Sequence, residues 1–283
     1  MTAILSIQSS VAYGHVGNSA ATFPLMRLGV EVWPVLTVHF SNHTGYESWR
    51  GPLLAASDIA DVIKGLDERG VLARCDAVLS GYQGGADVGA VILDAVALVK
   101  ERNPSAIYCC DPVMGDVDRG MYVREGIPEF MRDRVVPAAQ ILTPNHFELE
   151  YLTGRPAKTL DDVITAADQV RAMGPDTVLV TSVVHDLVAE DRLQMIAVTE
   201  GEAWSVTLPL LHQTFTGSGD LTAATFLAHV LTTDLPTALS RTAAIVHGVL
   251  SKTVESGRSE LQLVAAQDEI AAPSQHFEAT RIR

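Results

Sequence analysis

Cysteine is scarce in this sequence, and its three cysteines are poorly spaced for a structural role. Cys75, Cys109 and Cys110 are an odd set without the C-x-x-C spacing of zinc sites, so neither a disulfide framework nor a zinc site is indicated. Cys110 is expected to be a buried strand residue, because cysteine is commonly buried, and we assign it no role. Free thiols indicate a reducing compartment.

Lys and Arg residues are also scarce. The chain has 20 Lys and Arg residues against 34 Asp and Glu residues, which gives a formal net charge of −14. Nucleic acid and anionic membrane surfaces repel such an acidic protein over about a Debye length. Small molecules are therefore the expected partners, with no nucleic acid and no membrane, and an anionic substrate must be held by local groups.

Long hydrophobic runs are absent as well. No stretch approaches the roughly 18 apolar residues of a membrane span. The chain passes from Met1 directly into an apolar segment, residues 3–7, without the features of a signal peptide, so a cytoplasmic location is expected. Neither G-x-x-x-x-G-K-[ST] nor G-x-G-x-x-G occurs, and any phosphate chemistry must use another scaffold.

Short apolar runs alternate with helical patterns along the chain. Apolar residues at helical spacing predict crossover helices over 86–101 and 161–173. The alternation predicts an α/β fold, a single domain spanning residues 1–283, in which helices flank both faces of a central, mostly parallel β-sheet. The runs that predict strands are residues 3–7, 31–38, 76–80, 106–110, 140–144, 177–183 and 193–198.

Two segments depart from this alternation. Residues 199–211 predict a hairpin with Gly201 in the turn, because Trp204, Val206 and Leu208 alternate with polar residues. Residues 33–50 are aromatic and polar, which indicates a small lid or an edge rather than core.

The sharpest local motif is Thr216-Gly217-Ser218-Gly219-Asp220, which leads into a helical pattern. Glycines permit a tight turn, and the N-terminus of the following helix offers unpaired N–H groups and a positive dipole end to an anion. Beside a phosphate, Asp220 is a candidate base for an attacking alcohol. The alternative is that Ser218 or Asp220 only caps the helix.

Two further motifs bring carboxylates to the ends of predicted strands. Asp111 and Asp116 lie in the loop D-P-V-M-G-D directly after the run 106–110, where open α/β sheets bind ligands. In T-P-N-H-F-E, Thr143 is placed to cap a helix on which Asn145 and Glu148 share one face. Oxygen donors from two strand ends suit Mg²⁺ bridging the phosphates of ATP. Taken singly, each acidic residue also fits ordinary turn or helix-start chemistry.

The three motifs together resemble the ribokinase-like superfamily, whose members pair a DP-x-x-G loop, an N-x-x-E helix and a C-terminal G-x-G-D anion hole. The segments SIQSSVAYGHVGNSAATFPLMRLG, WPVLTVHFSNHTGY, LSGYQG, DPVMGD and TPNHFELEYLTG are similar to the pyridoxal kinases in particular. The resemblance covers nearly the whole chain. It implies a ribokinase-like fold with a small lid or flap, a homodimer, and ATP-dependent phosphorylation of the 5′-hydroxymethyl group of a vitamin B6 form.

The resemblance also implies roles for individual residues. Asp220 would be the catalytic base, with Gly217, Ser218 and Gly219 forming the anion hole, and Tyr122 would belong to a flap over the nucleotide. The implied vitamin pocket consists of Ser9, His43, Thr44, Gly45, Tyr82 and Asp220. The implied ATP and Mg²⁺ residues are Asp111, Asn145 and Glu148, and Asp116, Thr143 and Thr181 would surround the phosphates, Mg²⁺ or an activating monovalent cation such as K⁺.

Two positions depart from the pattern of close relatives. Gly45 stands where some relatives have glutamine beside the substrate, which bears on the preferred B6 form. Thr181 stands where some have lysine near the nucleotide, and a hydroxyl cannot supply that charge. Two alternative functions remain: a hydroxymethylpyrimidine kinase of the same superfamily, and a protein that binds pyridoxal phosphate without turnover.

Overall fold

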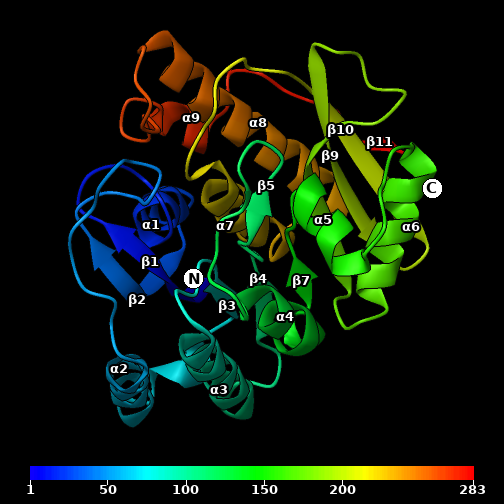
Figure 1. Cartoon of the computed structure of the whole chain (residues 1–283). Coiled ribbons are helices and arrows are strands. Elements are labelled where there is room, and N and C mark those ends of the chain that lie inside the picture. Colours follow the sequence, from blue (N-terminus) through cyan, green and yellow to red (C-terminus); the bar gives the residue numbers. More distant parts are fainter.

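The computed structural model describes all 283 residues and is built around one sheet of nine strands. The strands lie in the order β11-β10-β9-β8-β7-β4-β3-β1-β2 (Figure 1). Their bounds are β1 Ala3–Val11, β2 Glu31–Phe40, β3 Ala77–Ser80, β4 Ile107–Cys110, β7 Ile141–Leu142, β8 Thr177–Val183, β9 Arg192–Thr199, β10 Glu202–Pro209 and β11 Thr280–Arg281. Every apolar run predicted to be a strand is one.

The sheet is parallel from β2 to β8 and antiparallel beyond β8. Strands β9 and β10 form the predicted hairpin, in which Glu202 pairs with Thr199 and Gly201 adopts a positive φ of 82° in the turn. The short strand β11 adds to the outer edge of β10. The prediction of a central, mostly parallel sheet is confirmed.

Helices cover both faces of the sheet, as predicted. Helices α2, α3, α5 and α6 contribute to one apolar cluster of 35 buried residues, and α1, α7, α8 and α9 contribute to a second cluster of 31 on the opposite face. The helices are α1 Asn18–Arg27, α2 Ala56–Glu68, α3 Ala86–Arg102, α4 Ile127–Phe130, α5 His146–Thr153, α6 Leu160–Arg171, α7 Ser218–Val230, α8 Leu235–Glu255 and α9 Gln267–Ala271. Two cores of similar size explain why the central strands are apolar on both sides.

The interpretation of residues 33–50 as a lid or an edge rather than core is right in part. Residues 33–40 belong to β2, which is the edge strand of the main sheet, and Val35 and Val38 are buried. The edge prediction is therefore confirmed for residues 33–40, but these residues also contribute to the core: Phe40 is buried, and Trp33 packs partly buried against one of the two large apolar clusters. Only residues 41–50 form a loop, here called the 41–50 loop.

A small hairpin stands apart from the main sheet. Strands β5 (Gly115–Asp116) and β6 (Gly120–Met121) pair with each other, directly after the DP motif. Figure 1 places β5 close to α7 and α5 in the middle of the molecule, over the carboxyl ends of the parallel strands. We call residues 115–122 the flap, because they include Tyr122, which the family resemblance places in a flap over the nucleotide. No helix is long and apolar enough to cross a membrane.

Candidate active site

A cleft of about 1100 Å³ lies at the carboxyl ends of the parallel strands. All residues singled out in the sequence line it, although they come from nearly every part of the chain. They are Ser9, His43, Thr44, Gly45, Tyr82, Asp111, Asp116, Tyr122, Thr143, Asn145, Glu148, Thr181, Gly217, Ser218, Gly219 and Asp220. The crossover connections bring them together because parallel strands all end on the same edge of the sheet.

The start of α7 has the geometry of an anion site. Its N-cap is Gly217, with a φ of 89° and no side-chain capping bond, so neither Ser218 nor Asp220 caps the helix. The first intrahelical bond runs from the Leu221 N–H to the Gly217 carbonyl, which leaves the N–H groups of residues 218–220 outside the helical ladder. A Cβ atom at Gly217 would lie 1.9 Å from the His15 carbonyl oxygen, so only glycine fits.

Asp220 lies half-buried at this helix start. Burial raises the pKa of its carboxyl group to about 6, although a hydrogen bond from the Gly17 N–H group acts in the opposite direction and lowers the pKa. Its Oδ1 lies 3.4 Å from the position of a Cβ on Gly81, which directly follows β3. A carboxylate with a pKa near neutrality accepts a proton from an alcohol more readily than an ordinary aspartate does.

Glu148 fixes the DP loop and the start of α5. Its Oε1 accepts the Met114 N–H at 2.9 Å, its Oε2 accepts the Asn145 N–H at 2.9 Å, and the Asn145 side chain caps the helix in return. The helix therefore begins after Asn145, and the prediction that Thr143 caps it is wrong. Burial raises the pKa of Glu148 to about 7.

Asp111 connects these elements to the anion site. Thr143 Oγ1 donates a hydrogen bond to Asp111 Oδ1 at 3.1 Å, and Oδ2 lies 3.4 Å from the position of a Cβ on Gly219. The pKa of Asp111 lies well above its usual range because the group is buried and because the charges of Glu148 and Asp220 disfavour ionisation. The loop after β4 and the start of α7 thus face one another across the cleft.

This set of carboxylates suits a divalent cation that a substrate helps to hold. Asp111, Glu148 and Asp220 are crowded negative groups without a Lys or Arg partner, so a nearby cation would relieve their repulsion. The protein alone offers no group of three or more His, Cys, Asp or Glu side chains arranged around one metal ion. Mg²⁺ fits this pattern, because it commonly takes one or two carboxylates and completes its shell with water and phosphate oxygens.

The other end of the cleft is less charged. Tyr82 is half-buried after β3, and burial raises the pKa of its phenol. Ser9 is buried at the end of β1, where a Cβ on Gly17 would lie 2.4 Å from the Ser9 hydroxyl oxygen. His43 and the exposed Thr44 come from the 41–50 loop. An aromatic side chain, with hydroxyl groups and the face of an imidazole ring around it, suits a flat ring with a polar edge.

Comparison with known proteins identifies the family. The chain is 58% identical to the pyridoxal kinase PdxY of Rubrobacter xylanophilus, over 99% of this chain and 97% of that protein. It is 54% identical to the pyridoxal kinase PdxY of Leifsonia xyli, over 99% of both chains. The chain belongs to the pyridoxal kinase family.

Further matches agree with this assignment. The pyridoxal kinase of Leishmania donovani, solved with ADP and pyridoxamine, superposes with a TM-score of 0.94 over 100% of both chains at 29% identity. The pattern of the phosphomethylpyrimidine kinase family matches residues 61–263. The fold is ribokinase-like, and members of the pyridoxal kinase family are ATP-dependent phosphotransferases with an alcohol acceptor.

Two residues that were expected to contact ligands already form bonds within the protein. The Asp116 carboxylate pairs with Arg119, whose Nε lies 2.8 Å from Oδ2, so in this structure it is less available to a metal ion than Asp111 is. The Thr181 N–H donates to the Pro144 carbonyl at 2.9 Å and joins β8 to the start of α5, while its side chain lines the cleft.

Sequence reasoning missed three residues of the cleft region. Ser182 has a φ of 53°, a left-handed conformation that non-glycine residues rarely adopt, and it follows Thr181 at a break in the β8 register. Arg119 lies over the Tyr122 ring at 4.8 Å and also pairs with Asp116, so it contacts both ends of the flap. Glu260 contacts the 41–50 loop from far along the chain. No local motif marks any of them.

Proposed function

We propose that this protein transfers the γ-phosphoryl group of ATP to the 5′-hydroxymethyl group of pyridoxal, giving pyridoxal 5′-phosphate and ADP, through one kinase domain that spans residues 1–283. One observation carries the proposal: a half-buried aspartate with a raised pKa lies at an open helix N-terminus, and an aromatic pocket adjoins it in the same cleft. A kinase needs a base and an anion hole beside the pocket for its acceptor.

In the proposed reaction, Asp220 accepts the proton of the hydroxymethyl group as its oxygen attacks the γ-phosphorus in line with the departing ADP. The backbone N–H groups of residues 218–220 stabilise the charge on the transferring group. Asp111 and Glu148 would hold Mg²⁺ directly or through water, and the ion would supply charge neutralisation at the phosphates. The flap would cover the nucleotide and keep water from competing as acceptor.

The vitamin would occupy the less charged end of the cleft. Tyr82 would pack against the pyridine ring, and Ser9 would form a hydrogen bond with a ring substituent. A Tyr82→Ala variant is expected to raise the KM for pyridoxal at least about fivefold, because an aromatic contact is worth roughly 1 kcal/mol beyond the buried area, and to leave the KM for ATP near its wild-type value. Equal changes in both KM values would contradict this placement.

A hydroxymethylpyrimidine kinase is the second candidate, because the phosphomethylpyrimidine kinase pattern matches residues 61–263. The two substrates share a flat ring and a primary alcohol. Separate assays of ADP release with pyridoxal, pyridoxine, pyridoxamine and hydroxymethylpyrimidine distinguish the two functions and rank the B6 forms. Faster turnover of hydroxymethylpyrimidine than of any B6 form would replace the first proposal with the second.

A protein that stores pyridoxal phosphate is a weaker candidate. Binding alone does not call for a carboxyl group whose pKa is raised to about 6 beside an anion site, since the charge would repel the bound phosphate. Excess Mg-ATP and pyridoxal should give many moles of ADP per mole of protein. Stoichiometric binding without ADP release would favour storage.

We further propose a cytoplasmic homodimer. Three buried free cysteines suit a reducing compartment. The exposed side chains of Tyr13, Trp49 and Leu53 offer an apolar surface beside β2 that a second copy would cover. Native mass spectrometry at micromolar concentration tests the dimer.

The hydroxyl oxygens of Thr143 and Thr181 support the proposal of an activating monovalent cation such as K⁺. A comparison of the activity in K⁺ with the activity in Na⁺ would test it.

A further inference from the structure

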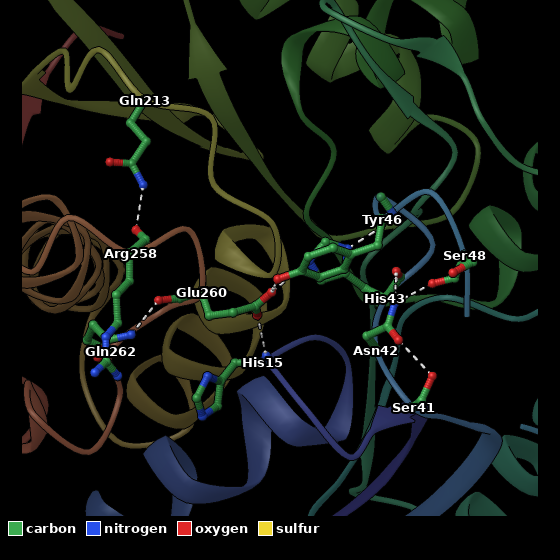
Figure 2. Close-up of polar contacts among 11 residues, drawn as sticks. His15, Ser41, Asn42, His43, Tyr46, Ser48, Gln213, Arg258, Glu260 and Gln262 are labelled. Atoms are coloured by element: carbon green, nitrogen blue, oxygen red, sulfur yellow. Dashed lines mark hydrogen bonds and ion pairs between the residues drawn. The ribbon is translucent and has the colours of Figure 1, made fainter. Parts of the chain in front are cut away.

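Glu260 lies outside every recognised motif, yet its side chain is only 8% exposed and is surrounded by hydrogen-bond donors. The His15 backbone N–H donates to Oε2 at 3.1 Å. Oε1 accepts from the Tyr46 hydroxyl at 2.7 Å and from His43 Nε2 at 3.0 Å. Figure 2 shows His43 and Tyr46 pointing toward Glu260 from one side and His15 approaching it from the other.

The contact determines how His43 is presented. The Gly45 N–H donates to His43 Nδ1 at 3.1 Å, so Nδ1 acts as an acceptor and the ring proton lies on Nε2, facing Glu260. Both ring nitrogens are therefore used within the protein. The Tyr46 ring packs beside the imidazole with centroids 4.6 Å apart. His43 can thus face a ligand with its ring but has no free nitrogen to offer.

The segment that carries Glu260 is itself tied to the anion site. The Gln213 side chain donates to the Arg258 carbonyl at 3.0 Å, and Gln213 precedes the Gly217 turn. A Cβ on Gly217 would lie 3.3 Å from Leu261 Cδ1 and 1.9 Å from the His15 carbonyl. The chain at His15 therefore runs between Glu260 and the start of α7. Residues 258–261 contact both the anion site and the 41–50 loop.

The 41–50 loop also reaches the flap. A Cβ at Gly45 would lie 2.9 Å from His43 Nδ1 and 3.7 Å from Arg119 Nη1. Gly45 thus lies where the loop and the flap meet over the cleft. If His43 moved away from Glu260, Gly45 would move with it, and the contact between the 41–50 loop and the flap would change.

We propose that Glu260 is a positioning residue, which holds the 41–50 loop over the vitamin pocket and fixes it relative to the anion site at Gly217. Glu260 touches no reacting atom in this scheme. It acts through His43 and Tyr46 on one side and through His15 on the other. The proposal rests on the pyridoxal kinase function proposed above. It states that Glu260, a residue near the C-terminus, affects the affinity for the acceptor but not the affinity for ATP.

The direct test is Glu260→Gln. An amide has one acceptor atom and one donor group, so glutamine cannot accept from His15 on one side and from His43 and Tyr46 on the other. The KM for pyridoxal is expected to rise roughly tenfold, as loss of a hydrogen bond to a charged group implies, while the KM for ATP stays within about twofold of its wild-type value. Hydrogen exchange of backbone amides in residues 41–50 is expected to accelerate.

Two further variants complete the experiment. Glu278→Gln makes the same chemical change at an exposed glutamate, and it should alter neither KM value nor the exchange of residues 41–50. Tyr46→Phe removes one of the three bonds from a side chain that is 36% exposed, so the chain is expected to fold even if Glu260→Gln does not. It should raise the KM for pyridoxal about threefold.

The outcomes separate this proposal from the proposed function. If the wild-type protein does not phosphorylate pyridoxal, the proposed function fails. If wild-type turnover is normal and both Glu260→Gln and Tyr46→Phe keep the wild-type KM for pyridoxal and the wild-type exchange of residues 41–50, the positioning role of Glu260 is overturned. A rise in both KM values together with a lowered melting temperature would also overturn it, because that pattern indicates a general structural role.

Discussion

Replacing Asp220 with asparagine should make the protein more stable and far less active. Burial raises the pKa of Asp220 from 3.8 to about 6. A shift of roughly 2 units corresponds to about 3 kcal/mol, which is the most that the buried charge costs the folded state at alkaline pH. Asparagine has the same shape, no charge, and a carbonyl oxygen that can still accept from Gly17. We expect it to recover about 1–3 kcal/mol of unfolding free energy at pH 8.

The pH dependence follows from the direction of the shift. Because the folded-state pKa lies above the unfolded one, the folded protein binds the proton more tightly, and the cost of the charge grows as pH rises from about 4 to about 6 and is complete above that window. The stabilisation of Asp220→Asn should therefore be about twice as large at pH 8 as at pH 5.

Two assays test this reasoning. Urea unfolding, followed by tryptophan fluorescence in EDTA at both pH values, gives the stability difference. Initial rates of ADP release give the activity, which should fall at least about 100-fold on loss of a general base. Unchanged stability at pH 8 would refute burial as the cause of the raised pKa. Wild-type turnover would remove Asp220 from the role of base.

Three further predictions follow. Asp111→Asn keeps an acceptor for Thr143 but loses the charge, so the Mg²⁺ concentration for half-maximal rate should rise about tenfold; an unchanged Mg²⁺ titration would contradict the metal assignment. Gly217→Ala places a Cβ 1.9 Å from the His15 carbonyl at a φ of 89°, so kcat should fall at least about 100-fold; near-normal kcat would contradict an anion hole at this turn. Arg119→Ala removes the contacts of Arg119 with Asp116 and Tyr122, so water should reach the nucleotide more easily and ADP release in the absence of any acceptor should rise several-fold. An unchanged rate of ADP release without acceptor would show that Arg119 does not help to exclude water.

Much of the fold was predictable because its signals are local. The strands predicted between residues 3 and 198 are short apolar runs, and helix α7 follows glycines that mark its start. Residues 33–40 form an edge strand, as predicted, but the expectation that they lie outside the core was wrong, because an edge strand still packs one face against the core. Thr143 misled because the neighbouring Asn145 makes a better cap, joined reciprocally to Glu148.

The remaining parts of the site depend on contacts that sequence spacing does not reveal. His43 and Glu260 are 217 positions apart, and only the course of the chain after α8 brings them together. Asp116 was expected to serve a metal ion, and its pairing with Arg119 depends on the turn between the short strands β5 and β6. The left-handed conformation of Ser182 similarly depends on tertiary packing, since serine has no intrinsic preference for it.

The most direct test of the central claim is the identity of the product. Purified protein should be incubated with Mg-ATP and an equimolar mixture of pyridoxal and hydroxymethylpyrimidine, and the products should be identified by mass. The proposed pyridoxal kinase function predicts pyridoxal 5′-phosphate as the main product, formed together with an equal amount of ADP. Phosphorylated pyrimidine as the main product, or no phosphorylated product of either kind, would contradict it.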